Sequence, residues 1–299
     1  MPLVGEPAYL LPLTSYLYLL PSAMPTPLVV QPGSSVNLAH VDTRADGGLE
    51  RSAAKEQLEA YQRELDELQE LLYAADDHAL LVVLQGMDTS GKDGVIRSVF
   101  SRVSPLGCSV ASFKPPTSTE LAHDFLWRVH QATPPRGHIT IFNRSHYEDV
   151  VVVRVKELVP EATWRARYEH INGFERLLVE SNTIVLKFFL HVSPEEQEER
   201  LRKREEDMRK AWKLDPDDWR ERRRWSDYMK AYEEAFARCS TEWAPWHIVP
   251  SDRKWYRDLV VAETIVGTLR TYRDAWLAKL SRMGEARKAE LAAVRSKGT

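Results

Sequence analysis

A glycine-rich stretch with a single lysine has the residue types and spacing of a phosphate-binding loop. It runs Gly-Met-Asp-Thr-Ser-Gly-Lys over residues 86–92, between an apolar run at 80–84 and a helical pattern. Glycines let backbone N–H groups approach an anion, the helix N-terminus adds a positive dipole end, and Lys92 reaches the outer phosphates. An ordinary strand-to-helix turn is the alternative, but the order strand, loop, lysine, helix favours phosphate binding. The predicted phosphate-binding residues of this stretch are Gly86, Thr89, Ser90, Gly91, Asp93 and Gly94.

This loop departs from the common pattern at one position, and the departure bears on metal binding. Asp93 follows the lysine, where the common motif has a Ser or Thr hydroxyl for Mg²⁺. A carboxylate stands inside the loop instead, at Asp88, and carboxylate oxygens bind Mg²⁺ directly or through water. We therefore predict that Asp88 is a ligand for Mg²⁺, or for Mn²⁺ in its place.

A second cluster of charged residues follows a later apolar run. The run at 137–142 is typical of a buried strand and ends in Asn-Arg-Ser-His-Tyr-Glu-Asp at 143–149. Ligands of open parallel sheets bind outside the carboxyl ends of the strands, where phosphoryl transfer needs a metal-organising acid and a phosphate-clamping base. The acids also suit an ordinary helix N-terminus, so that interpretation stays open on these residues alone. We predict catalytic roles for Asp88, Lys92, Arg144, Glu148 and Asp149, with Asp149 as a second metal ligand, and phosphate or nucleotide contacts for Asn143 and Lys114.

Apolar runs and amphipathic stretches predict the elements that position these residues. Strands are expected at 80–84, 108–113, 137–142, 183–192 and 246–250, and helices at 52–73, after the loop lysine, at 117–130, at 164–180, from 194, and from 252 to about 280. Strands that alternate with helices indicate a parallel sheet. With 299 residues, 43% of them hydrophobic, the chain can bury one large core. We predict an α/β fold: a P-loop kinase three-layer sandwich with a central, mainly parallel sheet and a helical lid.

The charged segment at about 194–235 is expected to form this lid. Many of its Glu residues have a Lys or Arg four positions later, which is typical of a solvated helix. Arg204, Lys213, Arg223 and Arg224 have no acid four positions earlier. P-loop kinases exclude water from the transfer with a mobile segment between two strands, so we favour a lid over a solvated helix.

The two ends of the chain and its overall charge limit the remaining function classes. Residues 1–50 are interpreted as a disordered extension and arm, 51–283 as the kinase domain and 284–299 as a frayed tail. The first 30 residues are Pro-rich and have no basic residue, so they suit neither a signal peptide nor a membrane span; a start at Met24 is an alternative. A net charge of −3 and two cysteines without metal-ligand spacing predict a cytoplasmic protein with no nucleic-acid or membrane partner.

Five motifs, in order, resemble the polyphosphate kinase 2 family. They are GMDTSGKDG (86–94), SFKPPTSTELAHDFLWRVH (112–130), FNRSHYEDV (142–150), WKLDPDDWRERRRW (212–225) and APWHIVPSDRKWYRD (244–258). By position, the resemblance implies that lid residues Lys213, Arg222 and Arg224 contact phosphate, and we include Arg204 and Arg223 with them. Asp215 stands where the family pattern leads us to expect Ser. The wording GKDG and FNRSHYED resembles the branch that accepts AMP as well as ADP.

The resemblance implies a Mg-dependent phosphotransferase that moves a terminal phosphoryl group from inorganic polyphosphate to AMP and/or ADP, in the direction of nucleotide synthesis. Expected partners are polyphosphate and adenine nucleotides, with guanine nucleotides as further acceptors, in a homodimer or homotetramer. From the residues alone, an ATP-dependent nucleoside monophosphate kinase stays open, because it would share the loop, the acids and the lid. A non-catalytic nucleotide-binding sensor is disfavoured because Lys92 and the second cluster are both present.

Overall fold

The computed structural model describes residues 27–208, 212 and 214–297. Its sheet consists of β1 (Leu28–Val29), β2 (Ala79–Gln85), β3 (Cys108–Ser112), β4 (Ile139–Asn143), β5 (Thr183–His191) and β6 (Trp246–Pro250). The spatial order is β1-β6-β5-β2-β4-β3, and all neighbours are parallel except β1 with β6. The strands β3 and β4 lie on one side of β2, and the later strands β5 and β6 lie on the other side. The strand order therefore reverses beside β2. This reversal is where open α/β sheets bind ligands.

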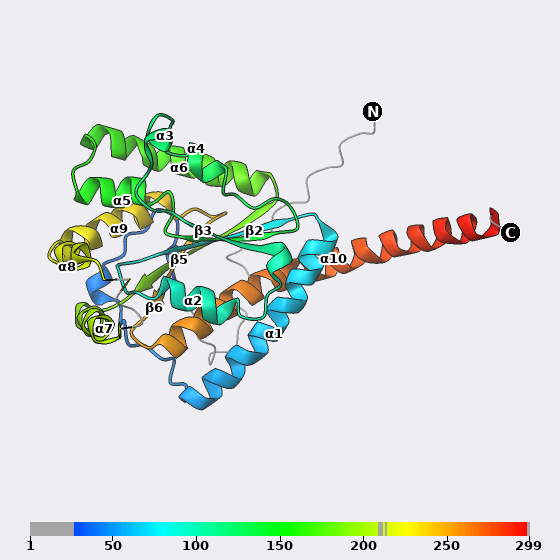
Figure 1. The fold of residues 1–299 in the computed structure, drawn as a ribbon, viewed down its shortest axis with the longest axis horizontal. Helices are drawn as coiled ribbons and strands as arrows, with labels where there is room; N and C mark the ends of the chain where they lie inside the picture. The colour runs from blue at the N-terminus through cyan, green and yellow to red at the C-terminus, as the bar shows by residue number, and fades with distance from the viewer. Residues whose placement is uncertain (1–26, 209–211, 213, 298–299) are drawn as a thin grey trace.

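Helices cover both faces of the sheet (Figure 1). One face carries α1 (Arg51–Ala75), α2 (Lys92–Val99) and α10 (Lys254–Lys297), and the other carries α5 (Glu148–Val155), α6 (Glu161–Glu180) and α9 (Trp225–Cys239). Alternate β2 residues supply the two cores, with Leu81 and Val83 facing α5, α6 and α9 and Leu80 and Val82 facing α1, α2 and α10. Both faces of the central strands are therefore buried, which confirms the predicted three-layer α/β sandwich.

The helix predicted at 117–130 is interrupted. The capping box forms, since the Thr117 hydroxyl accepts from the Glu120 N–H and the Glu120 carboxylate accepts from the Thr117 N–H, but α3 (Ser118–Leu121) stops after one turn. The Asp124 carboxylate accepts from the Leu126 N–H at 2.9 Å before α4 (Trp127–His130) begins. This local bond offers the backbone an alternative to the helix and separates the two segments.

The charged segment forms two helices, α7 (Pro194–Glu206) and α8 (Pro216–Arg222), before α9. Ser193 caps α7 by accepting from the Glu196 N–H at 3.2 Å, as predicted. Asp215 caps α8 by accepting from the Asp217 N–H at 2.9 Å. Asp and Ser serve equally well at this position, so the departure from the family pattern keeps the helix start. Lys213, a predicted phosphate contact, lies outside the described residues.

The arm and the last helix complete the fold. Two short 3₁₀ segments, η2 (Leu38–His40) and η3 (Pro105–Gly107), lie in the arm and before β3. The last helix, expected to end near residue 280, continues to Lys297, and Figure 1 shows it extending past the sheet. Within the described residues, no helix combines the length and the apolar run needed to cross a bilayer.

Candidate active site

The phosphate-binding loop connects β2 to α2 and requires glycine at two positions. Gly86 has φ +145°, and a Cβ there would lie 2.7 Å from the Leu190 carbonyl oxygen. Gly91 has φ +110°, and a Cβ there would clash with the guanidinium of Arg257. Thr89 also adopts a left-handed backbone, with φ +60°. These conformations turn the loop tightly over the start of α2, as an anion-binding loop requires.

Lys92, the first residue of α2, lies folded over the loop. Its side chain is 8% exposed, and its Nζ donates to the carbonyl oxygens of Gly86 at 2.7 Å and Met87 at 3.2 Å. Burial, together with the nearby Arg144 charge, lowers the pKa of Lys92 to about 8. A phosphate in the loop would restore a full positive charge, because an anion favours the protonated form.

The second predicted cluster meets the loop at the carboxyl ends of β2 and β4. Arg144 donates from Nη2 to Asp88 Oδ1 at 2.5 Å and from Nη1 to Glu148 Oε2 at 3.2 Å. Asn143 donates to Asp93 Oδ1 at 2.9 Å. Arg144 has φ +61°, a conformation that is uncommon outside glycine and is found at functional sites. The two clusters, about fifty residues apart in sequence, therefore form one site.

The environment of Asp88 suits a hard cation. Burial acts to raise the pKa of Asp88, but Arg144 and Lys92 outweigh it and hold the pKa below its usual value. Asp218 of α8 also faces Asp88, and burial together with the Asp88 charge raises the pKa of Asp218 to about 6. No group of three or more His, Cys, Asp or Glu side chains gathers as a metal site within the described part of the chain. Mg²⁺ needs only one or two carboxylates beside phosphate oxygens and water, so Asp88 fits this ion.

Asp149 lies among arginines on the α6 side of the cluster. Its Oδ1 accepts from Arg167 Nη1 at 3.3 Å, and its Oδ2 lies 3.7 Å from Arg128 Nη2. Burial raises the pKa of Asp149 despite these cations. The Oδ2 atom is buried and accepts no hydrogen bond, so this oxygen has acceptor capacity left for a ligand. Glu148, rather than Asp149, shares Arg144 with Asp88.

The predicted lid arginines differ in their contacts. Arg222 donates to the Pro194 carbonyl at 2.5 Å and to Gln197 Oε1 at 3.0 Å, and Arg204 donates to Asp218 at 2.8 Å. Arg224 donates to the Val155 carbonyl at 2.7 Å. Arg223 is exposed, and no ion pair or hydrogen bond to its side chain is described. Lys114, after β3, is exposed, and its carbonyl accepts from Arg128 at 2.8 Å.

Sequence reasoning missed three side chains that contact the loop backbone. Gln197 donates to the Asp88 carbonyl at 3.1 Å, Arg200 donates to the carbonyls of residues 89 and 90, and Arg257 donates to the Ser90 carbonyl at 3.4 Å. In the sequence, Gln197 and Arg200 belong to a segment typical of a solvated helix. Their only signal is the spacing of three residues between them, which places both on one helix face, and the spacing of four between Gln197 and the buried Leu201.

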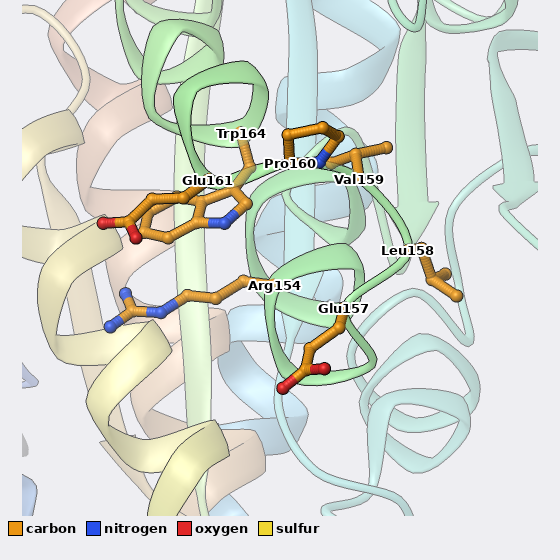
Figure 2. A pocket seen from close by; sticks show the side chains of 7 residues that line it. All are labelled: Arg154, Glu157, Leu158, Val159, Pro160, Glu161 and Trp164. Carbon is orange, nitrogen blue, oxygen red and sulfur yellow. The ribbon is translucent and has the colours of Figure 1, made fainter.

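A cavity of about 550 Å³ lies at the other end of α5, away from this site. It is lined by Arg154, Glu157, Leu158, Val159, Pro160, Glu161 and Trp164 (Figure 2). Arg154 stacks over the Trp164 ring at 4.7 Å and pairs with Glu234 at 2.6 Å. Because its arginine is already neutralised and it shares no residue with the loop, we place the chemistry at the loop instead.

Comparisons with known proteins show the family of this chain. The family model described as polyphosphate kinase 2 (PPK2) matches residues 48–275. The chain is 50% identical over 242 residues to an AMP/ADP-polyphosphate phosphotransferase of Meiothermus ruber, covering 80% of this chain and 91% of that protein. It is 42% identical over 257 residues to an ADP-polyphosphate phosphotransferase of Rhodopseudomonas palustris, covering 82% and 89%.

A solved structure shares the fold as well. The crystal structure of polyphosphate kinase 2 from Arthrobacter aurescens TC1 superposes with a TM-score of 0.78 at 38% identity, covering 83% of this chain and 92% of that one. The family match spans the loop, the second cluster and the lid, which are the elements that form the site described above. The chain belongs to the polyphosphate kinase 2 family.

Proposed function

We propose that this protein transfers the terminal phosphoryl group of inorganic polyphosphate to AMP and to ADP. The observation that carries the proposal is that four side chains meet at the carboxyl ends of β2 and β4, in a chain of this family: Asp88, Lys92, Arg144 and Glu148. The printed name of the Meiothermus ruber relative, an AMP/ADP-polyphosphate phosphotransferase, supports both acceptors. The sequence around the loop and the second cluster favours the same branch.

The protein itself supplies little covalent chemistry in this reaction. An oxygen of the acceptor's own phosphate attacks the terminal phosphorus of the chain, and the bond from that phosphorus to the bridging oxygen breaks. The acceptor gains one phosphoryl group, and polyphosphate leaves one unit shorter. Because the attacking oxygen is already ionised at neutral pH, no general base is required, and catalysis rests on positioning and charge neutralisation.

The side chains at the loop suit that task. Lys92 and the loop N–H groups hold the reacting phosphates, and Arg144, placed between Asp88 and Glu148, stabilises the negative charge on the moving group. Asp88, with Asp149 as the second candidate, would hold Mg²⁺, which when bound neutralises phosphate charge and aligns donor with acceptor. Asn143, bonded to Asp93, fixes the loop against the end of β4.

The lid supplies cations for the polymer. Arg222 donates to α7 and Arg224 donates to α5, whereas Arg223 between them is exposed. Among the described lid arginines, Arg223 is therefore best placed to contact polyphosphate. Polyphosphate is a regular polyanion, so binding through such residues depends strongly on salt. The lid is proposed to include residues 194–235, within a kinase domain of residues 51–283.

We further propose guanine nucleotides as additional acceptors, a homodimer or homotetramer, and a cytoplasmic location. These follow from the sequence resemblance and from composition. Light scattering on the purified protein measures the mass of the assembly, and a monomeric mass contradicts the oligomer. Offering GMP and GDP with polyphosphate tests the acceptor range.

A donor swap tests the proposed function directly. Purified protein with Mg²⁺ receives AMP or ADP, each with long-chain polyphosphate or with ATP or GTP as donor, and the products are separated. ADP and ATP formed from AMP and polyphosphate alone are the expected result. ATP from ADP but nothing from AMP would overturn the acceptor choice, and turnover only with a nucleoside triphosphate donor would indicate an ordinary nucleotide kinase.

A further inference from the structure

Arg200, in the second turn of α7, uses all five of its N–H donors within the protein. Its Nη1 donates to the carbonyl oxygens of Thr89 at 3.0 Å and Ser90 at 3.1 Å. Its Nη2 donates to the carbonyl oxygens of Ser251 at 2.6 Å and Asp252 at 3.0 Å. Its Nε donates to Glu196, one turn earlier, at 2.8 Å. One guanidinium thus joins three segments of chain: the phosphate-binding loop, the turn after β6, and its own helix.

This side chain is buried, so its bonds are protected from water. Its side chain is 8% exposed, and Glu196 offsets its charge. A peptide unit is planar and trans, so an N–H points opposite to the carbonyl of the preceding residue. The Ser90 carbonyl points toward Arg200, and the Gly91 N–H therefore points away from it. By fixing the Ser90 carbonyl, Arg200 fixes the direction in which the loop presents the Gly91 N–H.

Gln197 adds a second contact from the same face of α7. Its Nε2 donates to the Asp88 carbonyl at 3.1 Å, and its Oε1 accepts from Arg222 of α8 at 3.0 Å. The start of α7 is itself tied down, because the Ser193 N–H donates to Asp252 Oδ1 at 2.8 Å. The first two turns of α7 are thus bonded to the loop on one side and to the turn after β6 on the other.

We infer that Arg200 is a positioning residue for phosphoryl transfer, which bonds the first turns of α7 to the phosphate-binding loop. Arg200 contacts the loop backbone rather than the reacting atoms, and it acts by holding the loop in the shape that binds phosphate. The inference rests on the proposed function only for the identity of the ligand.

The experiment compares Arg200→Ala and Arg200→Lys with Arg202→Ala as a matched control. Arg202 lies on the same helix but is 64% exposed, and its described contacts are with Glu198 and the Trp219 ring rather than with the loop. The Lys variant keeps the charge, but one ammonium cannot bond four carbonyls in two segments. Each protein is measured for hydrogen exchange of the 86–92 backbone, for binding of inorganic tripolyphosphate, and for kcat/KM with and without added methylguanidinium.

In both Arg200→Ala and Arg200→Lys, we expect faster hydrogen exchange of the loop amides and weaker binding of tripolyphosphate. We also expect kcat/KM to fall about 100-fold, since misplaced groups cost about that factor. Methylguanidinium should restore part of the activity of Arg200→Ala, whose cavity it fits, and Arg202→Ala should match the wild type. Loop exchange and tripolyphosphate binding unchanged in both Arg200 variants would overturn the inference. Faster hydrogen exchange spread equally over the whole domain would also overturn it, because that result indicates a general stabilising role for Arg200. Exchange needs no turnover, so it tests Arg200 independently of the donor.

Discussion

At the scale of single residues, the site joins a lysine and an aspartate in one loop with an arginine that lies more than fifty residues later. Lys92, Asp88 and Arg144 are close enough to perturb one another's pKa, which is typical of residues arranged for chemistry. Their partners within the protein are carbonyls and carboxylates, which an incoming phosphate and cation can replace.

Lys92→Ala is expected to lower kcat by on the order of 10³-fold, since one fixed donor to developing charge contributes about that factor. Among the residues that the structure describes, the lysine side chain donates hydrogen bonds only to the carbonyls of residues 86 and 87, so the sheet should fold without it. Steady-state kinetics measure the loss, and circular dichroism checks the fold. Transfer at the wild-type rate would remove the loop from the mechanism.

Asp88→Asn is expected to raise the Mg²⁺ concentration needed for half-maximal activity by about 10- to 100-fold, because losing a protein group that helps to hold a metal ion costs about this factor in metal affinity. Asp149→Asn should have the smaller effect, since Arg167 and Arg128 already engage Asp149. Titrating Mg²⁺ at saturating nucleotide compares the two variants. The reverse ranking would make Asp149 the principal ligand.

At the scale of elements, arginine side chains join α7 and α8, two helices of the proposed lid. Arg222 bonds α8 to α7, and Arg204 of α7 bonds Asp218 of α8. The indole of Trp219 in α8 donates a hydrogen bond from Nε1 to Glu205 Oε1 of α7 at 2.8 Å. The two helices are therefore joined before any substrate arrives, and only some of the basic side chains are available to the polymer.

Arg223→Ala is expected to raise KM for polyphosphate, to lower the salt dependence of binding by about one unit of slope, and to leave the melting temperature unchanged. Arg222→Ala should instead loosen α8 from α7 and weaken the use of nucleotide and polyphosphate together. Kinetics at several salt concentrations and thermal melts separate the two variants. An equal defect in both would mean that the arginines share one role.

The contact of α1 with α10 contains a carboxyl whose protonation affects stability. Glu263 is buried near Tyr61 and Arg270, and burial raises its pKa from 4.5 to about 7. The folded protein therefore binds more protons than the unfolded chain between about pH 4.5 and pH 7, and the free energy of unfolding falls as pH rises through this window.

Glu263→Gln mimics the protonated form and should remove this dependence. It should be more stable than the wild type at pH 8 and no more stable at pH 4.5, by urea unfolding at both values. Glu67→Gln, on the exposed face of α1, is the matched control and should follow the wild type at both. Parallel pH profiles for Glu263→Gln and the wild type would show that Glu263 stays ionised.

At the scale of the whole molecule, α10 is the longest described element and leaves the body of the domain. Its first part packs on α1 and α2 through residues such as Leu259 and Trp276, whereas residues 285–296 are exposed (Figure 1). Deleting residues 285–299 should therefore leave the melting temperature and kcat nearly unchanged, since exposed substitutions rarely exceed about 0.5 kcal/mol. Calorimetry and kinetics measure both quantities. A large loss of stability, or a change in the number of chains in the assembly, would show that another copy covers this helix.

Much of this molecule was predictable because local patterns carry it. The glycine spacing at 86–91, the buried run of β2 and the cap at Ser193 each act within a few residues, and the structure confirms the strand, the loop and the helix start. The helix at 117–130 was wrong in its middle, because a single Asp124 side-chain bond competes with the helix there. The roles of the site residues stay predictions.

Residue types and their spacing were enough to predict the order of the strands, the loop between β2 and α2, and the family. Which side chains contact one another became visible in the folded molecule: Arg144 lies between Asp88 and Glu148, Asp149 lies against Arg167, and Arg222 lies against α7. It also showed that Arg200 bonds the loop rather than solvent. The reason is physical: a charged residue on a helix has the same sequence pattern whether it faces water or a carbonyl, and only packing between distant segments distinguishes the two.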